Sequence, residues 1–95
     1  MPQAIVDPAE LRRFAHNLKQ FTNDLQSRMS VLHGQMVGLA STWRDQEHEK
    51  FAQEYTDTMQ AISRFVEAAT VHIPFLLRKA ERVEEYLQQR WGIAN

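Results

Sequence analysis

Cysteine is absent from this 95-residue sequence, and glycine and proline occur only three times each. Without cysteine the chain can form neither a disulfide framework nor a thiol-based site. So few turn residues, together with the lack of a regular alternation of apolar and polar positions, argue against β-strands joined by tight turns. The sequence therefore predicts an all-α protein.

An excess of one charge sign is also missing, since 11 Lys and Arg stand against 12 Asp and Glu. The basic face of a nucleic-acid-binding protein is therefore not indicated, and no nucleic-acid partner is expected. The longest apolar run, residues 71–77, is interrupted by His72 and Pro74, so no membrane insertion is expected. Residues 1–7 lack the basic and hydrophobic regions of a signal peptide, so export by the general secretory route is not expected.

The first helix is predicted over about residues 8–39. Asp7 can cap it, Pro8 suits the first helical position, and Glu10 completes a capping box with Asp7. Its apolar positions recur every three or four residues, as along a helix–helix contact. They are Leu11, Phe14, Leu18, Phe21, Leu25, Met29, Leu32, Met36 and Leu39.

Gly34 and Gly38 lie four residues apart near the end of this helix. Two interpretations remain open. The pair can allow close approach of another backbone, or it can merely loosen the final turns, because glycine costs about 1 kcal/mol against alanine in a helix.

The second helix is predicted over about residues 45–90. Pro74 removes one backbone donor, so we expect a kink near residues 70–74 or a break into two segments. The apolar pattern continues through this region, which favours the kink. Its members are Phe51, Tyr55, Met59, Ile62, Val66, Ala69, Ile73, Leu76, Ala80, Val83 and Leu87.

An elbow, predicted over about residues 40–44, separates the two helices. Thr42 with Asp45 resembles a capping box at the start of the second helix, but Asp45 can instead be the cap itself. Trp43 is a large aromatic residue where a turn is usually polar. It can plug the end of the contact between the helices, and its edge can also serve as a docking site for a partner.

A single domain, residues 1–95, follows from these patterns: an antiparallel two-helix hairpin. The second helix is longer than the first, and the apolar stripes are wider than one helix–helix contact can cover. We therefore expect two hairpins to pair into a four-helix bundle. The residues predicted to form the hairpin and dimer core are Leu11, Phe14, Leu18, Phe21, Leu25, Leu32, Leu39, Tyr55, Ile62, Val66, Ile73 and Leu76.

Trp43 at the elbow, Phe51 eight positions later and the two-helix layout resemble the ESAT-six-like (Trp-Xaa-Gly) family of type VII secretion. Leu39 and Tyr55 also stand at apolar positions that fit the family pattern. The motif glycine is replaced by Asp45, a residue that tolerates turns. The resemblance spans nearly the whole chain in length and layout.

The resemblance implies a non-catalytic protein that pairs with a similar hairpin, as a homodimer or heterodimer, and that has a type VII secretion ATPase as a further partner. It implies export without a cleaved leader, with the chain cytoplasmic beforehand. The family's Tyr-x-x-x-Asp/Glu export signal is not matched, because Arg90 stands four residues after Tyr86. The candidate contacts for a partner or the export machinery are Val83, Tyr86, Leu87 and Trp91.

The remaining residues give no indication of an enzyme or of a cofactor. The four histidines, at positions 16, 33, 48 and 72, have no pair at the four-residue spacing of a helical metal site, and neither a phosphate loop nor a nucleophile motif is present. We therefore expect no catalytic, cofactor or metal residues. The alternative function is an intracellular adaptor or chaperone that binds a partner helix.

Overall fold

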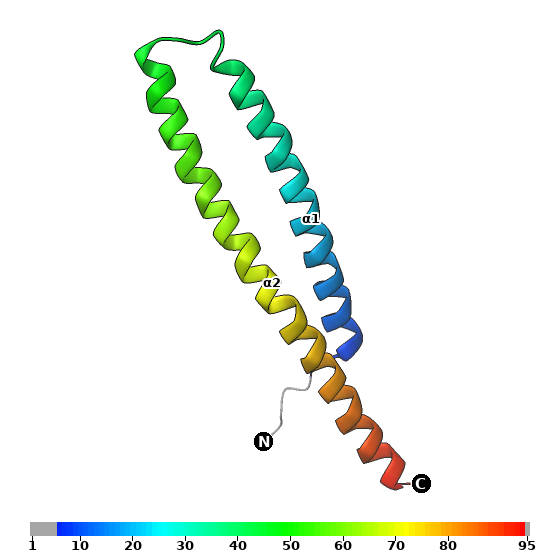
Figure 1. Cartoon of the computed structure of the whole chain (residues 1–95). Helices are drawn as coiled ribbons and strands as arrows, with labels where there is room; N and C mark the ends of the chain where they lie inside the picture. The colour runs from blue at the N-terminus through cyan, green and yellow to red at the C-terminus, as the bar shows by residue number, and fades with distance from the viewer. Residues whose placement is uncertain (1–5, 95) are drawn as a thin grey trace. The chain divides into compact units, whose positions relative to one another are not determined.

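A computed structural model describes residues 6–94 of the chain, with side chains through Gln89. Its regular structure consists of two helices, α1 (Pro8–Leu39) and α2 (Gln46–Ala94). They pack against each other as a hairpin, and no strand occurs in this part of the chain (Figure 1). The predicted all-α hairpin is confirmed. Dimerisation stays a prediction.

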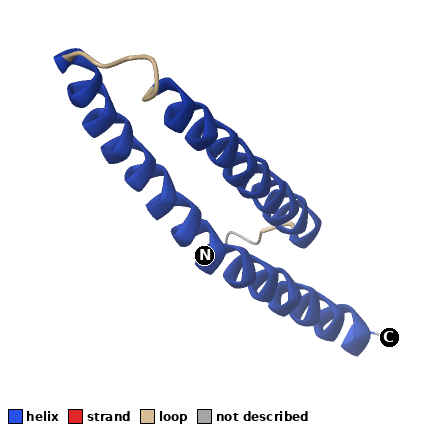
Figure 2. Cartoon of the chain, turned by 45° about the horizontal axis from the view of Figure 1, so that its top comes forward, coloured by secondary structure: helices blue, strands red, loops and turns tan. Residues whose placement is uncertain are grey.

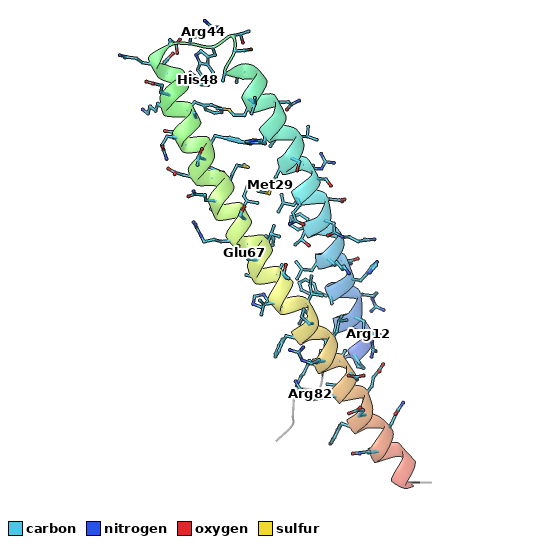
Figure 3. The ribbon with its side chains drawn as sticks, viewed as in Figure 1. Arg12, Met29, Arg44, His48, Glu67 and Arg82 are labelled. Carbon is cyan, nitrogen blue, oxygen red and sulfur yellow. The ribbon has the colours of Figure 1, made fainter. Side chains whose placement is uncertain are left out.

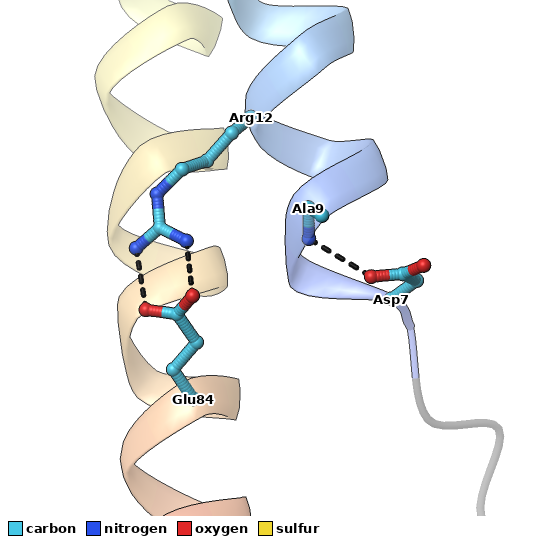
Figure 4. A network of polar contacts seen from close by, with 4 residues as sticks. All are labelled: Asp7, Ala9, Arg12 and Glu84. Carbon is cyan, nitrogen blue, oxygen red and sulfur yellow. Dashed lines mark hydrogen bonds and ion pairs between the residues drawn. The ribbon is translucent and has the colours of Figure 1, made fainter.

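The start of α1 is fixed by Asp7. Its carboxylate oxygen Oδ1 accepts a hydrogen bond from the backbone N–H of Ala9 at 2.9 Å (Figure 4). Its carbonyl accepts a hydrogen bond from the backbone N–H of Leu11 at 3.1 Å. Glu10 lies in the first turn, where a negative charge suits the helix dipole. The cap read from the sequence thus stands at the first helix boundary.

The second helix begins at Gln46, so the elbow comprises residues 40–45. It continues without interruption through Pro74 to Ala94, and it is therefore not broken into two segments. The kink predicted near residues 70–74 stays a prediction.

The contacts of the chain divide it into two compact units, described separately below. The elbow unit comprises Phe21–Ala68, and the terminal unit comprises Met1–Gln20 with Ala69–Asn95. In the elbow unit, the second part of α1 and the first part of α2 lie side by side in both views of the molecule (Figures 1 and 2).

In the elbow unit, the buried and half-buried residues of α2 alternate steps of four and three residues, while on α1 the half-buried Met29 is followed by Met36, seven residues on. On α1, Thr22 is buried and is followed by half-buried Leu25 and Met29; on α2, buried Val66 continues a row of half-buried residues. This spacing keeps one side of each helix facing its partner. The half-buried residues of that row on α2 are His48, Ala52, Tyr55, Met59 and Ile62.

The terminal unit has small residues at its centre. Ala15 of α1 and Ala69 and Ala80 of α2 are buried, and small side chains let two helices approach closely. The half-buried apolar residues around them are Leu11, Leu18, Ile73, Leu76, Val83 and Leu87. Among the described residues of either unit, no large side chain is fully buried.

Candidate functional site

The elbow closes both helix ends with its own polar groups. The carbonyl of Leu39 accepts hydrogen bonds from the backbone N–H groups of Thr42 and Trp43 at 3.1 and 2.9 Å, and the Ser41 hydroxyl donates to the carbonyl of Gly38 at 2.7 Å. The last two carbonyls of α1, those of Gly38 and Leu39, are thus satisfied within the chain.

Asp45 is the cap of α2. Its Oδ1 accepts a hydrogen bond from the backbone N–H of His48, three residues on, at 3.2 Å. Of the two caps that the sequence left open, Asp45 therefore holds this position, while the Thr42 hydroxyl donates to the Leu39 carbonyl of α1. No described residue has a positive φ, so the aspartate stands here without backbone strain.

Trp43 lies at the centre of an aromatic cluster in the elbow unit. Its indole N–H donates to Oδ1 of Asp45 at 2.8 Å. Its ring centroid lies 5.3 Å from that of His48 and 5.6 Å from that of Phe51, and Phe51 in turn lies 6.5 Å from Tyr55. Such distances are typical of favourable ring pairs. Figure 3 shows His48 and Arg44 at this end of the hairpin.

A groove of about 770 Å³ opens beside this cluster, within the elbow unit. Leu32 and Leu39 line it from α1, and Phe51 and Tyr55 line it from α2. Leu32, Leu39 and Phe51 are exposed. The groove therefore presents apolar side chains from both helices to solvent.

Phe21 and Phe65 form a further exposed apolar pair in the elbow unit. Their rings meet edge to face, with centroids 6.0 Å apart and planes at 84°, yet the two residues remain 54% and 45% exposed. Phe65 follows Phe51 by 14 residues, close to four turns, so both lie on one side of α2. We name this surface the aromatic face; its residues are Phe21, Leu32, Leu39, Phe51 and Phe65.

The elbow unit also carries a second, polar groove, of about 520 Å³. Gln26, Ser30 and His33 line it from α1, and Ser63 and Glu67 line it from α2. Met29 and Val66 form the remainder of its lining. Apolar side chains predominate in the lining of the first groove, whereas five of the seven residues that line the second are polar.

The terminal unit is joined by an ion pair between its helices. Arg12 of α1 donates from both terminal nitrogens to the two carboxylate oxygens of Glu84 of α2, one of them at 2.7 Å (Figure 4). These hydrogen bonds hold the pKa of Glu84 below its ordinary value and raise the pKa of Arg12. Both side chains are partly exposed, so solvent screens the pair.

The structure distributes the predicted core residues between two environments. Phe14 and Phe21, predicted for the hairpin and dimer core, are exposed in the single chain, and the neighbouring Ala15 and Thr22 are buried. Leu32 and Leu39 of the same predicted set are likewise exposed, as is Phe51 of the predicted elbow motif. The predicted residues that are buried or half-buried are Leu11, Leu18, Leu25, Tyr55, Ile62, Val66, Ile73 and Leu76.

The predicted export contacts fall in the terminal unit. Tyr86 is exposed, whereas Val83 and Leu87 are half-buried. The side chain of Trp91 lies outside the described residues. Of the four candidates, Tyr86 thus presents the most accessible described side chain.

Three polar features were not found from the sequence: the Trp43–Asp45 bond, the position of His48 against Trp43, and the Arg12–Glu84 pair. Each depends on side-chain direction rather than on residue type. Two buried polar atoms, Nε2 of His48 and the hydroxyl of Tyr55, have no partner among the described residues. Within the same residues, no group of three or more His, Asp or Glu is placed to hold a metal ion.

These observations define a class of protein: a small two-helix hairpin with a tryptophan held in its elbow and apolar side chains left exposed beside it. Residues 3–91 match the WXG100 family, described as proteins of 100 residues with WXG. The chain belongs to this family, the ESAT-six-like family of type VII secretion. It is therefore a small helical protein related to type VII secretion.

No curated protein and no solved structure matches the chain. Neither helix, over residues 6–94, has an apolar stretch long enough to cross a lipid bilayer. The predicted family is confirmed, and Asp45 stands where the motif has glycine.

Proposed function

We propose that this chain acts in type VII secretion as a non-catalytic binding protein that pairs, through its aromatic face, with a second helical hairpin. The observation that carries the proposal is the exposure of Phe21 and Phe65, which touch each other but remain about half open to solvent. Contiguous exposed apolar side chains are typical of interaction surfaces.

The exposed area of the chain supports the same proposal. It exposes 7649 Å², whereas a folded monomer of its 11.1 kDa mass is expected to expose about 5,700 Å². A standard interface removes about 800 Å² from each partner. Burial of the aromatic face against a second hairpin would therefore bring the chain closer to the surface area of an ordinary folded protein.

The contrast between the polar groove and the aromatic face supports pairing through the aromatic face. The polar groove is lined by side chains such as Gln26, Ser63 and Glu67, which water solvates well. The aromatic face offers rings and leucines, whose removal from water is favourable. A second hairpin laid on the aromatic face, as a homodimer or a heterodimer, would complete a four-helix bundle. Family membership favours a partner of the same kind.

Contact with the export machinery, including a secretion ATPase, is the second part of the proposal. Tyr86 is its main described contact, because its ring is exposed in the terminal unit, with Val83 and Leu87 beside it in the sequence. Trp91 belongs to the same candidate set. The paired hairpins would leave the cell without a cleaved leader.

Light scattering on the purified chain tests the pairing. We expect about twice the chain mass for the chain alone, or for a one-to-one mixture with a similar hairpin. Replacing both rings by serine, Phe21→Ser with Phe65→Ser, should return the mass to that of a monomer. The matched control is Val31→Ser, which removes an exposed apolar side chain of α1 outside the aromatic face.

An unchanged mass for the double serine variant would contradict the aromatic face as the pairing surface. A lower mass for Val31→Ser as well would show that the loss is not specific to that face. Far-UV circular dichroism should show the same helical content in all variants, because none of these side chains is buried.

A second candidate function is an intracellular adaptor that holds a partner helix. The apolar groove of about 770 Å³ beside the elbow favours it, since an amphipathic helix can lay its apolar side chains into such a groove. Export of the tagged chain, compared in strains with and without a type VII system, separates the two functions. Retention in both strains would support the adaptor.

A further inference from the structure

Asp45 makes two hydrogen bonds through one oxygen. Its Oδ1 accepts from the indole N–H of Trp43 at 2.8 Å and from the backbone N–H of His48 at 3.2 Å. The first donor belongs to the elbow and the second to the first turn of α2. One carboxylate therefore ties the indole of the elbow to the start of the helix.

The hydrogen bond to Asp45 adds a directional restraint to the packing of the tryptophan ring. Because Asp45 is the cap of α2, its carboxylate is fixed by the helix backbone. The indole then has a fixed acceptor at one edge and ring contacts with His48 and Phe51 at 5.3 and 5.6 Å. Three contacts on different neighbours define both the position and the tilt of the ring.

Glycine, the residue of the family motif at this position, can supply none of this, since it has no side chain. Its conformational freedom is also not needed here, because no described residue has a positive φ. Aspartate in place of the motif glycine therefore adds a hydrogen-bond acceptor and a helix cap without backbone strain.

We propose that Asp45 is a positioning residue for Trp43. Its carboxylate accepts the hydrogen bond of the indole N–H, the only donor of that side chain, so this donor is already used within the chain. Trp43, whose ring centroid lies 5.6 Å from that of Phe51 of the aromatic face, then offers a partner its ring surface and not its N–H. Only the part of this inference that concerns a partner rests on the proposed pairing function. The hydrogen bond itself is a property of the single chain.

Indole N–H exchange, followed by NMR on the ¹⁵N-labelled chain, tests the bond directly. The two indole signals are assigned with a Trp91→Phe variant. Asp45→Gly removes the acceptor, but glycine at a cap costs only a few tenths of a kcal/mol, so the helix should remain. We expect the Trp43 indole to exchange about tenfold faster in this variant. Asp45→Asn keeps an oxygen acceptor and should restore slow exchange.

The strength of pairing of the Asp45 variants tests the part of the proposal that concerns a partner. With the tryptophan released, Asp45→Gly should weaken pairing by about threefold to tenfold, because the ring must be ordered on binding. Asp45→Asn should pair as the wild type does. Asp45→Ala should lower the melting temperature clearly more than Asp45→Gly, because alanine is a poorer cap than glycine.

Equal indole exchange in the wild type and in Asp45→Gly would overturn the proposal, whatever the chain binds. Faster exchange with unchanged pairing would overturn the positioning role while leaving the pairing function intact. Failure of the wild-type chain to pair with itself or with a similar hairpin would contradict the proposed function, and the exchange experiment would still decide on the bond.

Discussion

Arg12 of α1 and Glu84 of α2 stand 72 positions apart in the sequence and face each other with two hydrogen bonds in the terminal unit. The pair is a polar link between the two helices of that unit. Because the bonds favour the ionised carboxylate, they lower the pKa of Glu84 in the folded chain. Folding and the ionisation of Glu84 are therefore coupled.

The first prediction concerns acid stability. A carboxyl group with a lowered folded pKa stabilises the fold above its ordinary pKa of about 4.3, and this contribution is lost as the pH falls through the folded value. Between about pH 6 and pH 3 the melting temperature of the wild type should fall more steeply than that of Glu84→Gln. The neutral variant should also melt lower than the wild type at neutral pH.

Glu85→Gln is the matched control for this prediction. Glu85 is an exposed neighbour with the same charge, so its removal changes the net charge equally without breaking the link to Arg12. Its melting curve should keep the steep acid dependence of the wild type. Equal slopes for Glu84→Gln and the wild type would show that the pair does not couple to folding.

The second prediction tests the small residues of the terminal unit. Ala69 is buried at 2% exposure, so Ala69→Leu must push the neighbouring helix away. Overpacking of this kind costs about 1–3 kcal/mol in the free energy of unfolding. Ala68→Leu, one residue earlier and exposed, should change stability by about 0.5 kcal/mol or less. Urea denaturation of both variants measures the difference, and equal stabilities would contradict the close packing.

The apolar positions predicted for α2 and the residues of α2 found buried or half-buried coincide at nearly every position, because a long apolar pattern with a constant period is compatible with only one buried face. On α1 the same period is compatible with two different buried faces. The rows Leu11–Phe14–Leu18 and Leu11–Ala15–Leu18 both alternate steps of three and four, and hydrophobicity favours the phenylalanine. The structure buries Ala15 and exposes Phe14, since close helix approach selects small side chains. Residue type alone does not carry that information.

The elbow shows the same limit. The sequence identifies Trp43 and two possible caps, because both follow from composition and spacing. It does not reveal that the indole N–H points to Asp45, since this depends on the rotamers of two side chains. The assignment of Phe14, Phe21 and Leu32 to a dimer core stays a prediction, because a single chain holds no partner to cover them.

The third prediction separates the two interpretations of Gly34. A Cβ added at this position meets nothing within 4 Å, and the residue lies in α1 about 200° around the helix from Leu32 of the aromatic face. Gly34→Ala should therefore raise the free energy of unfolding by about 1 kcal/mol and leave pairing unchanged. Gly38→Ala, one residue before the end of α1, should gain less.

Calorimetry and light scattering on the Gly34→Ala variant give both answers. A more stable chain that pairs less tightly would mean that a partner backbone approaches Gly34 closely. Gly34 would then be needed for pairing, and the lower stability that a glycine gives to α1 would be a consequence of that role.

The fourth prediction concerns the contact between Phe21 and Phe65. Their edge-to-face arrangement at 6.0 Å should couple the two residues by about 0.5–1.5 kcal/mol in a double-mutant cycle with leucine replacements, measured on the unpaired chain by urea denaturation. Each single change should cost about 1 kcal/mol or less, because both rings are half exposed and leucine retains apolar contact.

The same cycle, repeated where the chain pairs, separates the contact within the hairpin from the contact with a partner. A ring pair that also packs against a second hairpin should lose more free energy on substitution in the paired state than in the single chain. Val31→Leu provides the control, since it changes an exposed side chain outside the aromatic face. Identical coupling energies in the two states would confine the Phe21–Phe65 contact to the folding of the hairpin.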